Sequence, residues 1–172
     1  SQATRVDSDA LEIHLILGNV HRERGQVARA IQVHQALLQR PKLTRVEHAY
    51  ILLCLGLDFK RGGFVDRALE AFNEVVRMDP NNQYALLYLQ KLHEEQHQWA
   101  DAHRIRKQLV ALSGPDTQPR NQAILAFLEN ALGSEALAVG DRGRAARHFE
   151  EAIDLDAGTG PVGAVRGHRL QH

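Results

Sequence analysis

Apolar residues in the middle of the chain recur at the spacing of amphipathic helices. Over residues 49–59 and again over 65–76, apolar positions follow one another at intervals of three and four. Between these stretches, Gly62 and Gly63 supply the backbone freedom that a tight turn needs. Pro80 stops the second stretch, because proline lacks a hydrogen-bond donor and clashes with the preceding turn. The pattern predicts two helices joined by a turn.

This unit of two helices repeats along the chain with a period of 34 residues. One set of markers is Gly18, Gly56, Gln90, Gly133 and Gly167, which step by 38, 34, 43 and 34. The other set is Ala30, Ala68, Ala102 and Ala145, which step by 38, 34 and 43. Because two independent sets agree, we predict an all-α fold, a right-handed α-solenoid of antiparallel helix pairs.

The register of the repeats sets the expected boundaries. They are the end of a preceding repeat or a linker at 1–10, repeats at 11–44, 49–82, 83–116 and 126–159, an inserted loop and lead-in at 117–125, and the first helix of an incomplete fifth repeat at 160–172. A solenoid needs polar caps at its ends, so we expect this chain to be part of something longer, with ends that could self-associate.

Small residues are expected where the two helices of a unit cross. Close approach of the backbones leaves no room for a long side chain, so we predict that Gly56 faces Ala68. Overpacking at such a crossing costs on the order of 1 to 3 kcal/mol. The residues of the crossing therefore set the stability of the pair.

Composition narrows the possible partners and surroundings. The 172 residues suggest one domain by length, and 44% hydrophobic content is enough for a continuous core. Lys plus Arg equals Asp plus Glu at 21 each, so no net charge favours nucleic acid or anionic lipid. The longest apolar run, 49–57, is far short of the roughly 20 residues that span a membrane. With Cys54 as the single cysteine and no secretion signal, we expect a cytoplasmic location.

One short motif has the form of a metal site. His93, Glu94 and His97 match the zincin pattern, in which two histidines ligate zinc and the glutamate acts as a base. In the repeat register, however, His97 falls in the turn, and no third ligand is evident. We therefore expect no catalytic residue, no metal and no cofactor in this chain, and keep a zinc hydrolase only as a remote alternative.

The remaining reactive side chains are interpreted as structural. We expect His14, His21 and His34 to be buried and hydrogen-bonded, because they stand where the repeat usually has large apolar or aromatic residues. Cys54 lies among leucines, so a small core residue is expected there and not a nucleophile.

The second unit closely resembles the tetratricopeptide repeat. The residues that carry the resemblance are Leu55, Gly56, Phe59, Gly63, Ala68, Phe72 and Pro80. The first unit departs by placing His21 and His34 at the two aromatic positions. In the third, Gln90 replaces the glycine and Arg106 the second aromatic residue. Repeats of this kind usually bind other proteins and do not catalyse reactions.

More specific stretches resemble the bacterial lipopolysaccharide assembly protein B family. They include Leu17-Gly18-Asn19, Arg29-Ala30-Ile31, Asp66-Arg67-Ala68 and Trp99, and the resemblance covers about residues 9–156. It implies an adaptor on the cytoplasmic face of the inner membrane, with a membrane helix before the repeats and a rubredoxin-like metal module after them. The implied partners are a membrane-anchored AAA protease and the deacetylase that commits to lipid A. A generic tetratricopeptide module of a secretion, pilus or chaperone system is the main alternative.

In tetratricopeptide arrays, certain positions of the first helix of each pair line the concave face. The resemblance thus predicts a groove for a protein or peptide segment, formed by Leu15, Asn19, Tyr50, Leu53, Leu57, Lys60, Arg61, Tyr84, Leu87, Lys91 and Phe127. Exposed apolar patches mark contact sites, and tyrosine is favoured at binding hot spots. The alternative is that some of these side chains pack against the neighbouring unit.

One known binding mode of such arrays does not fit. The carboxylate clamp that holds the C-termini of chaperones needs Lys and Asn at particular sites of the first helices. Asn19 matches one of them, but Leu15, Cys54, Tyr84 and Tyr88 occupy others. We therefore expect a mainly apolar groove, rimmed by basic residues.

Overall fold

The computed structural model of the protein describes residues 2–159, which are helical almost throughout. They contain no β-strand, and this confirms the predicted all-α fold of paired helices. The elements are α1 (Gln2–Glu23), α2 (Val27–Leu38), α3 (Arg45–Arg61), α4 (Val65–Met78), α5 (Gln83–Glu95), α6 (Trp99–Leu112), the 3-10 turn η1 (Pro115–Thr117), α7 (Gln118–Ala138) and α8 (Arg142–Thr159). The expected helix at 160–172 lies outside the described residues.

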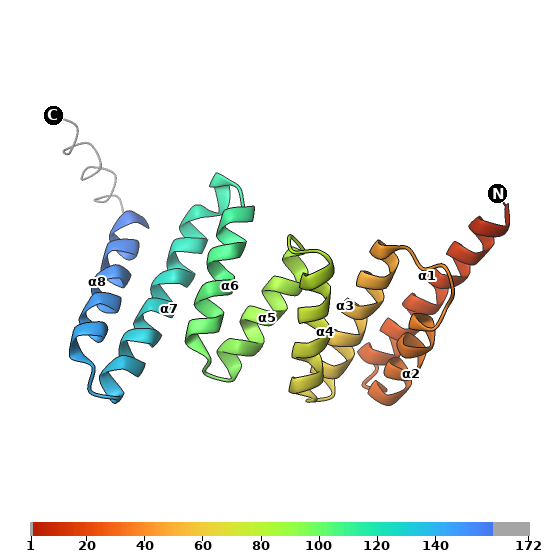
Figure 1. The fold of residues 1–172 in the computed structure, drawn as a ribbon, viewed down its shortest axis with the longest axis horizontal. Helices are drawn as coiled ribbons and strands as arrows, with labels where there is room; N and C mark the ends of the chain where they lie inside the picture. Colours follow the sequence, from red (N-terminus) through yellow and green to blue (C-terminus); the bar gives the residue numbers. More distant parts are fainter. Residues whose placement is uncertain (1, 160–172) are drawn as a thin grey trace. The chain divides into compact units, whose positions relative to one another are not determined.

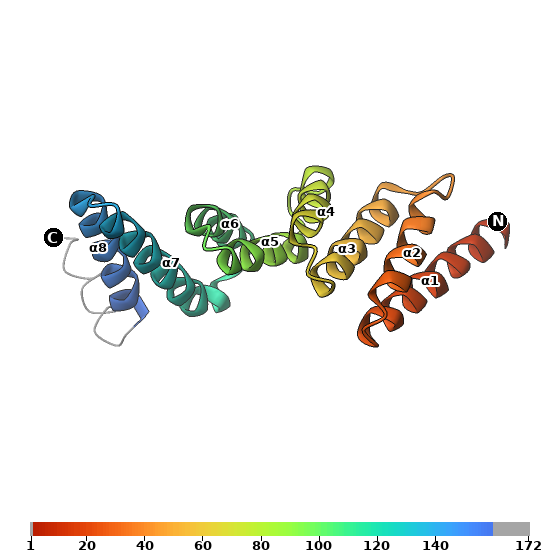
Figure 2. The same ribbon diagram turned by 90° about the horizontal axis from the view of Figure 1, so that it is seen from below.

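The chain folds into two compact units that divide between Ala85 and Leu86, where its length alone suggested one domain. In the first unit, α1 packs on α2, α3 packs on α4, and α2 also packs on α3 (Figure 1). In the second unit, α7 packs on α8 and α6 packs on α7, as the view from below also shows (Figure 2). Each unit therefore has helix pairs of its own.

The helices of a pair come close where a glycine lies under a ring. A Cβ atom added to Gly56 of α3 would lie 2.5 Å from Cε1 of Phe72 in α4, which is closer than atoms can pack. The same contact joins Gly18 to the ring of His34 and Gly133 to the ring of Phe149. Three of the four predicted repeats thus use one packing device.

The side chain nearest to Gly56 is that of Phe72 and not that of the predicted Ala68. The atoms nearest to the added Cβ all belong to the ring of Phe72, although Ala68 is fully buried in the same helix. Ala68 and Phe72 are one turn apart and share a face, and helical side chains lean toward the N-terminus of their helix. The ring therefore reaches back and covers the glycine that the sequence pattern assigned to alanine.

The turn inside each pair needs a left-handed backbone. Gly25, Gly63 and Gly140 have φ angles of 76°, 78° and 82°, which glycine adopts without steric cost. At the same position of the third repeat, His97 has a φ angle of 57°. Its side chain therefore belongs to a turn and not to the preceding helix.

Two expected boundary segments turn out to be largely helical. The segment at 2–10 is continuous with the rest of α1, so no break separates it from the first repeat. Of the segment at 117–125, all but its first residue belongs to α7, which begins at Gln118. Pro119 does not prevent this, because a proline in the first helical turn needs no donor.

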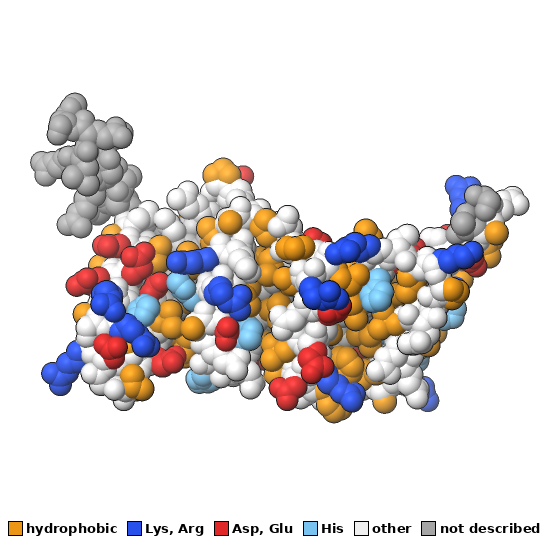
Figure 3. All heavy atoms as spheres, viewed as in Figure 1, with side chains coloured by type: hydrophobic (Ala, Val, Ile, Leu, Met, Phe, Trp, Pro, Cys, Tyr) orange, Lys and Arg blue, Asp and Glu red, His pale blue; other side chains and the backbone are white. Residues whose placement is uncertain are grey.

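The charged surface is mixed in sign. Acidic and basic side chains are interspersed over α8, at the left of Figure 3. Exposed pairs such as Arg77 with Glu74 and Arg104 with Asp101 lie within single helices. Pairs of this kind contribute at most about 1 kcal/mol each, so the fold depends on packing.

Candidate functional site

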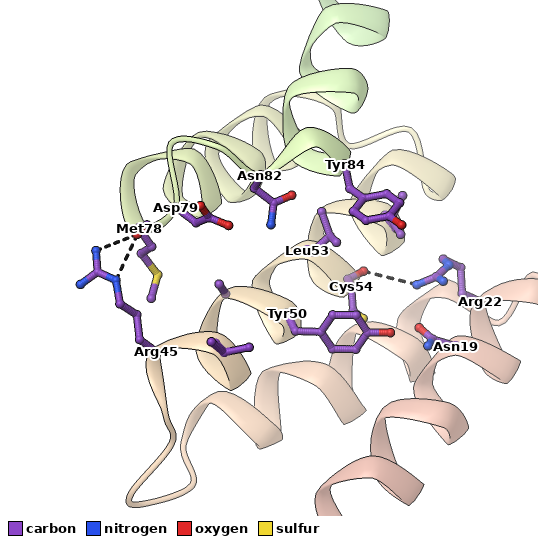
Figure 4. Close-up of a pocket in the computed structure, with 13 residues that line it drawn as sticks. Asn19, Arg22, Arg45, Tyr50, Leu53, Cys54, Met78, Asp79, Asn82 and Tyr84 are labelled. Atoms are coloured by element: carbon purple, nitrogen blue, oxygen red, sulfur yellow. Dashed lines mark hydrogen bonds between the residues drawn. The ribbon is translucent and has the colours of Figure 1, made fainter. Parts of the chain in front are cut away.

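The first unit contains a pocket of about 710 Å³ bordered by α1, α3, the end of α4 and the start of α5 (Figure 4). Its apolar lining includes Val46, Tyr50, Leu53, Leu57, Met78 and Tyr84. Tyr50 points toward Asn19 of α1, and Tyr84 borders the pocket from the start of α5. A hollow of this size with apolar walls can hold several side chains of a peptide.

The spacing of α3 aims its apolar residues at the pocket. Tyr50, Leu53 and Leu57 are separated by three and four residues, so they share one helical face. Tyr50 is 48% exposed and Tyr84 is 69% exposed, whereas Leu53 is buried at the base of the pocket. The two tyrosines therefore present apolar surface and hydroxyl groups to any molecule that enters.

Hydrogen bonds hold the start of α3 in place. Thr44 caps the helix: its Oγ1 accepts from the Glu47 backbone N–H at 3.1 Å, and Glu47 Oε2 accepts from the Thr44 N–H at 2.9 Å. Arg45 donates from Nε and Nη2 to the carbonyl oxygen of Met78, at 3.0 and 2.8 Å. The first turn of α3 is thereby tied to the end of α4, and both ends border the pocket.

A buried polar network lies beneath the pocket. Asp58 of α3 is fully buried and accepts from Arg22 Nη1 of α1 at 3.0 Å, while its second oxygen bonds Nδ1 of His34 in α2. Arg22 also donates to the Cys54 carbonyl oxygen at 3.4 Å. Removing one partner of such a buried pair costs about 3–5 kcal/mol. The network therefore fixes three helices against one another.

Cys54 is a core residue, as the sequence suggested. Its side chain is buried, and burial raises the pKa of the thiol to about 11. The Cys54 thiol and partial burial also raise the pKa of the Tyr50 hydroxyl above its ordinary value. Both groups are therefore protonated at neutral pH, so Tyr50 can donate a hydrogen bond and Cys54 is a poor nucleophile.

The predicted groove residues are distributed between two pockets. Those that line the first-unit pocket are Asn19, Tyr50, Leu53, Leu57 and Tyr84. Those that line a pocket of the second unit are Leu87, Lys91 and Phe127. Leu15 is buried in the core, and Lys60 and Arg61 line neither of the two pockets. The structure adds Arg45, Met78 and Asn82, which lie near helix ends, where the pattern of first-helix positions does not reach.

The second-unit pocket has a volume of about 440 Å³ and a more polar character. Apolar side chains of α5 and α7 face Gln90 and Arg106, both of which are buried. Arg106 Nη1 donates to Asn121 Oδ1 at 3.2 Å. In the sequence, both residues depart from the repeat pattern, which gives no role to either.

Comparisons with known proteins agree with this geometry. A model of the tetratricopeptide repeat family matches residues 1–42 and 55–103, which is more than half of the chain. The chain belongs to the tetratricopeptide repeat family.

Two relatives share one name. Lipopolysaccharide assembly protein B of Escherichia coli (strain K12) is 30% identical over 161 residues, covering 94% of this chain and 40% of that protein. The protein of that name from Haemophilus influenzae is 33% identical over 101 residues, covering 59% of this chain and 26% of that protein. The tetratricopeptide chain thus spans about two fifths of the length of the Escherichia coli relative.

Solved structures share the tetratricopeptide fold. MamA from Desulfovibrio magneticus RS-1 aligns with a TM-score of 0.59 at 16% identity, covering 86% of this chain and 96% of that one. PcrH, solved in complex with the chaperone-binding region of PopB, aligns with a TM-score of 0.52 at 19% identity, covering 83% and 94%. At these identities the likeness shows the fold alone.

The zincin pattern is divided between a helix and a turn of the third tetratricopeptide repeat. His93 lies in the last turn of α5, and its Nδ1 is 2.6 Å from Gln98 Oε1. His97 lies beyond the helix, and its ring packs on that of Trp99. Within the described part of the chain, no group of three or more His, Cys, Asp or Glu side chains could hold a metal.

The other histidines differ in burial. His34 is fully buried and hydrogen-bonded, as predicted, and His21 is half-buried, with Nδ1 2.7 Å from Gln26 Oε1. The prediction for His14 is wrong in its burial, because this residue is exposed, but its Nδ1 is hydrogen-bonded to the Ala10 carbonyl oxygen at 2.6 Å. It lines a surface pocket together with Val33 and Leu37 of α2. Among residues 2–159 we find no helix that is both long and apolar enough to span a membrane.

Proposed function

We propose that this chain is a non-enzymatic scaffold that binds proteins of lipopolysaccharide assembly at the cytoplasmic face of the inner membrane. Membership of the tetratricopeptide family supports a binding role, and the lipopolysaccharide assembly proteins that match most of this chain support the pathway. The resemblance suggests two partners: a membrane-anchored AAA protease and the deacetylase that commits to lipid A. By holding both, the scaffold would promote degradation of the deacetylase.

The observation that carries the proposal is the apolar first-unit pocket. Tyr50 and Tyr84 expose large rings, which a protein without a partner would tend to bury. Between them lie Leu53 and Leu57, which can accept apolar side chains of a bound segment. The capped start of α3 and the bond from Arg45 to Met78 hold these side chains in advance, so binding costs little conformational entropy.

The proposal makes a direct prediction for the two tyrosines. Alanine at Tyr50 or Tyr84 should weaken binding of the purified deacetylase at least about tenfold, because each change removes a large exposed ring. Isothermal titration calorimetry measures the affinity, and circular dichroism measures helicity, which should not change.

Ile13→Ala is the matched control. Ile13 is 63% exposed in the same unit but does not line the pocket, so its replacement should leave binding unchanged. Loss of helicity in the tyrosine variants would mean that the rings support the fold. Equal binding by all variants would rule out the pocket as the site. The resemblance to lipopolysaccharide assembly protein B also predicts a hydrophobic anchor and two CxxC pairs in the flanking gene sequence.

A further inference from the structure

The third repeat lacks the packing device of the other three. Where those repeats place a ring over a glycine, as Phe72 lies over Gly56, the third places Arg106 and Gln90 at the same two positions of the period. Both positions of the pair have changed, and both changes introduce a long polar side chain. Long polar side chains at a helix crossing are costly unless they are hydrogen-bonded.

These two side chains are buried but not fully satisfied. Gln90 is 3% exposed and Arg106 is 9% exposed, yet Gln90 Oε1 and Arg106 Nε have no hydrogen-bond partner. Each unpaired buried group costs about 1–3 kcal/mol. Both residues line the second-unit pocket, so a molecule in the pocket could satisfy a donor and an acceptor together.

The rest of each side chain is held in position. Gln90 Nε2 donates to Glu94 Oε1 at 2.8 Å. Arg106 Nη1 donates to Asn121 Oδ1, and Asn121 Nδ2 in turn donates to Ser113 Oγ at 2.9 Å. Both side chains are therefore held by hydrogen bonds through their other polar atoms.

The pocket has more positive than negative charge. Lys91, Arg106 and Arg120 line it, against the single carboxylate of Glu94. None of the three cations forms an ion pair with another described residue. Burial lowers the pKa of Arg106, with Glu94 opposing the shift and Arg120 adding to it. Glu94 therefore compensates only in part for the burial of the arginine.

We propose that this pocket binds an Asp or Glu side chain in an acidic peptide segment of a protein partner. The carboxylate accepts from Arg106 Nε, while Lys91 and Arg120 add attraction. A backbone N–H of the same peptide donates to Gln90 Oε1. The apolar side chains of Leu87, Ile124 and Phe127 accommodate a neighbouring apolar residue.

Two features favour a peptide over a phosphate group. Gln90 Oε1 needs a donor, which a peptide backbone supplies and a phosphate dianion does not. The Glu94 carboxylate also lines the pocket and repels a dianion more strongly than a single carboxylate. The site differs from a carboxylate clamp, because its central cation lies in α6, the second helix of its pair.

The test uses a variant that restores the common packing pair. Gln90→Gly combined with Arg106→Phe recreates the glycine–ring contact of the neighbouring repeats, so it should fold while closing the pocket. Random dodecapeptides displayed on phage are selected on the 172-residue chain, and the enriched peptides are then synthesised. We expect Asp or Glu beside a large apolar residue, and a loss of affinity of at least about tenfold in the double variant.

Three controls keep the test specific. Lys107→Gln removes an exposed cation of α6 outside the pocket and should preserve peptide affinity. Tyr50→Ala should preserve it as well, so failure of this site is distinguishable from failure of the proposed first-unit pocket. Replacing Asp by Asn, or Glu by Gln, in the peptide should abolish binding.

Several results would overturn the proposal. One is a selection in which Asp and Glu are not enriched among the peptides, or in which the double variant still binds every selected peptide. Another is binding of inorganic phosphate or of phosphatidylglycerol vesicles that depends on Arg106 and takes the place of peptide binding. Circular dichroism of the double variant must show wild-type helicity. If it does not, Arg106→Gln serves as the second variant, with the same expected loss of affinity.

Discussion

The second and third repeats are consecutive, have the same length and each contain two helices, yet they differ at the positions of the glycine and the ring. In the second, Gly56 lies under Phe72 and Gly63 makes the turn. In the third, Gln90 and Arg106 occupy the packing positions. His97 takes the left-handed turn.

The comparison separates what the fold requires from what it tolerates. Ala68 and Ala102, at equivalent positions, are both fully buried, so both repeats keep the small residue of the second helix. The glycine–ring pair is absent from the third repeat without loss of its helices. The alanine is therefore the stricter requirement, and the glycine–ring pair can be exchanged for long polar side chains, which we propose bind a partner.

The largest effect is expected from Ala68→Phe. A ring at this fully buried position overpacks the α3–α4 contact, and we expect a loss of about 3 kcal/mol in the free energy of unfolding. Glu70→Ala changes an exposed residue of the same helix and should have little effect. Thermal unfolding followed by circular dichroism measures both; equal effects would contradict the register of the repeat.

A somewhat smaller loss should follow Gly56→Ala. The new methyl group would lie about 2.5 Å from the ring of Phe72, which must shift, at a cost of about 2 kcal/mol. Gly114→Ala is the control, because Gly114 has a φ angle of −83° and no atom near an added Cβ. A stable Gly56→Ala protein would show that the ring can move away freely.

His97→Gly should raise stability by about 1 kcal/mol. Glycine adopts the left-handed turn without the steric cost that a side chain incurs, and it is the residue at this position in the other three repeats. Urea unfolding followed by fluorescence of Trp99, the single tryptophan, reports on the second unit, which contains this turn. An unchanged midpoint would mean that the contact of His97 with Trp99 offsets the strain.

The effect of Cys54 ionisation on stability is absent at neutral pH and appears only in alkali. Burial raises the thiol pKa from 9.0 to about 11, so the folded state favours the neutral form. The resulting stability is fully present below pH 9 and is lost as the pH rises toward 11. As the pH rises from 9 to 11, the denaturation midpoint of the wild type should fall more steeply than that of Cys54→Ala. If the midpoints of the two proteins fall in parallel with pH, the thiol is exposed to solvent.

The spacing of apolar residues predicted two helices in each repeat, and the pairs α1–α2, α3–α4 and α7–α8 are present in the structure. The spacing of apolar residues and the glycines of the turns are local signals, and each survives in the structure. Phe72 was not predicted as the neighbour of Gly56, because periodicity identifies small residues without showing which side chain leans over them. Likewise, the sequence alone did not show that Pro119 would start α7 instead of ending a loop.

The sites were less accessible to sequence reasoning. Positions on the first helices identified Tyr50, Leu53 and Tyr84 of the first-unit pocket, because helical spacing determines which residues share a face. Residues near helix ends, such as Arg45, follow no such rule. Gln90 and Arg106 were visible as departures from the pattern, but only coordinates show that both are buried with unpaired polar atoms.

The melting temperature of the Gln90→Gly/Arg106→Phe protein tests most directly whether the buried polar pair of the third repeat lowers the stability of the fold, as expected of residues that serve binding. Our account predicts that it rises above that of the wild type, because two unpaired buried groups are replaced by the contact that the other repeats use. A melting temperature below that of the wild type would show that the polar pair stabilises the fold, and would contradict the account.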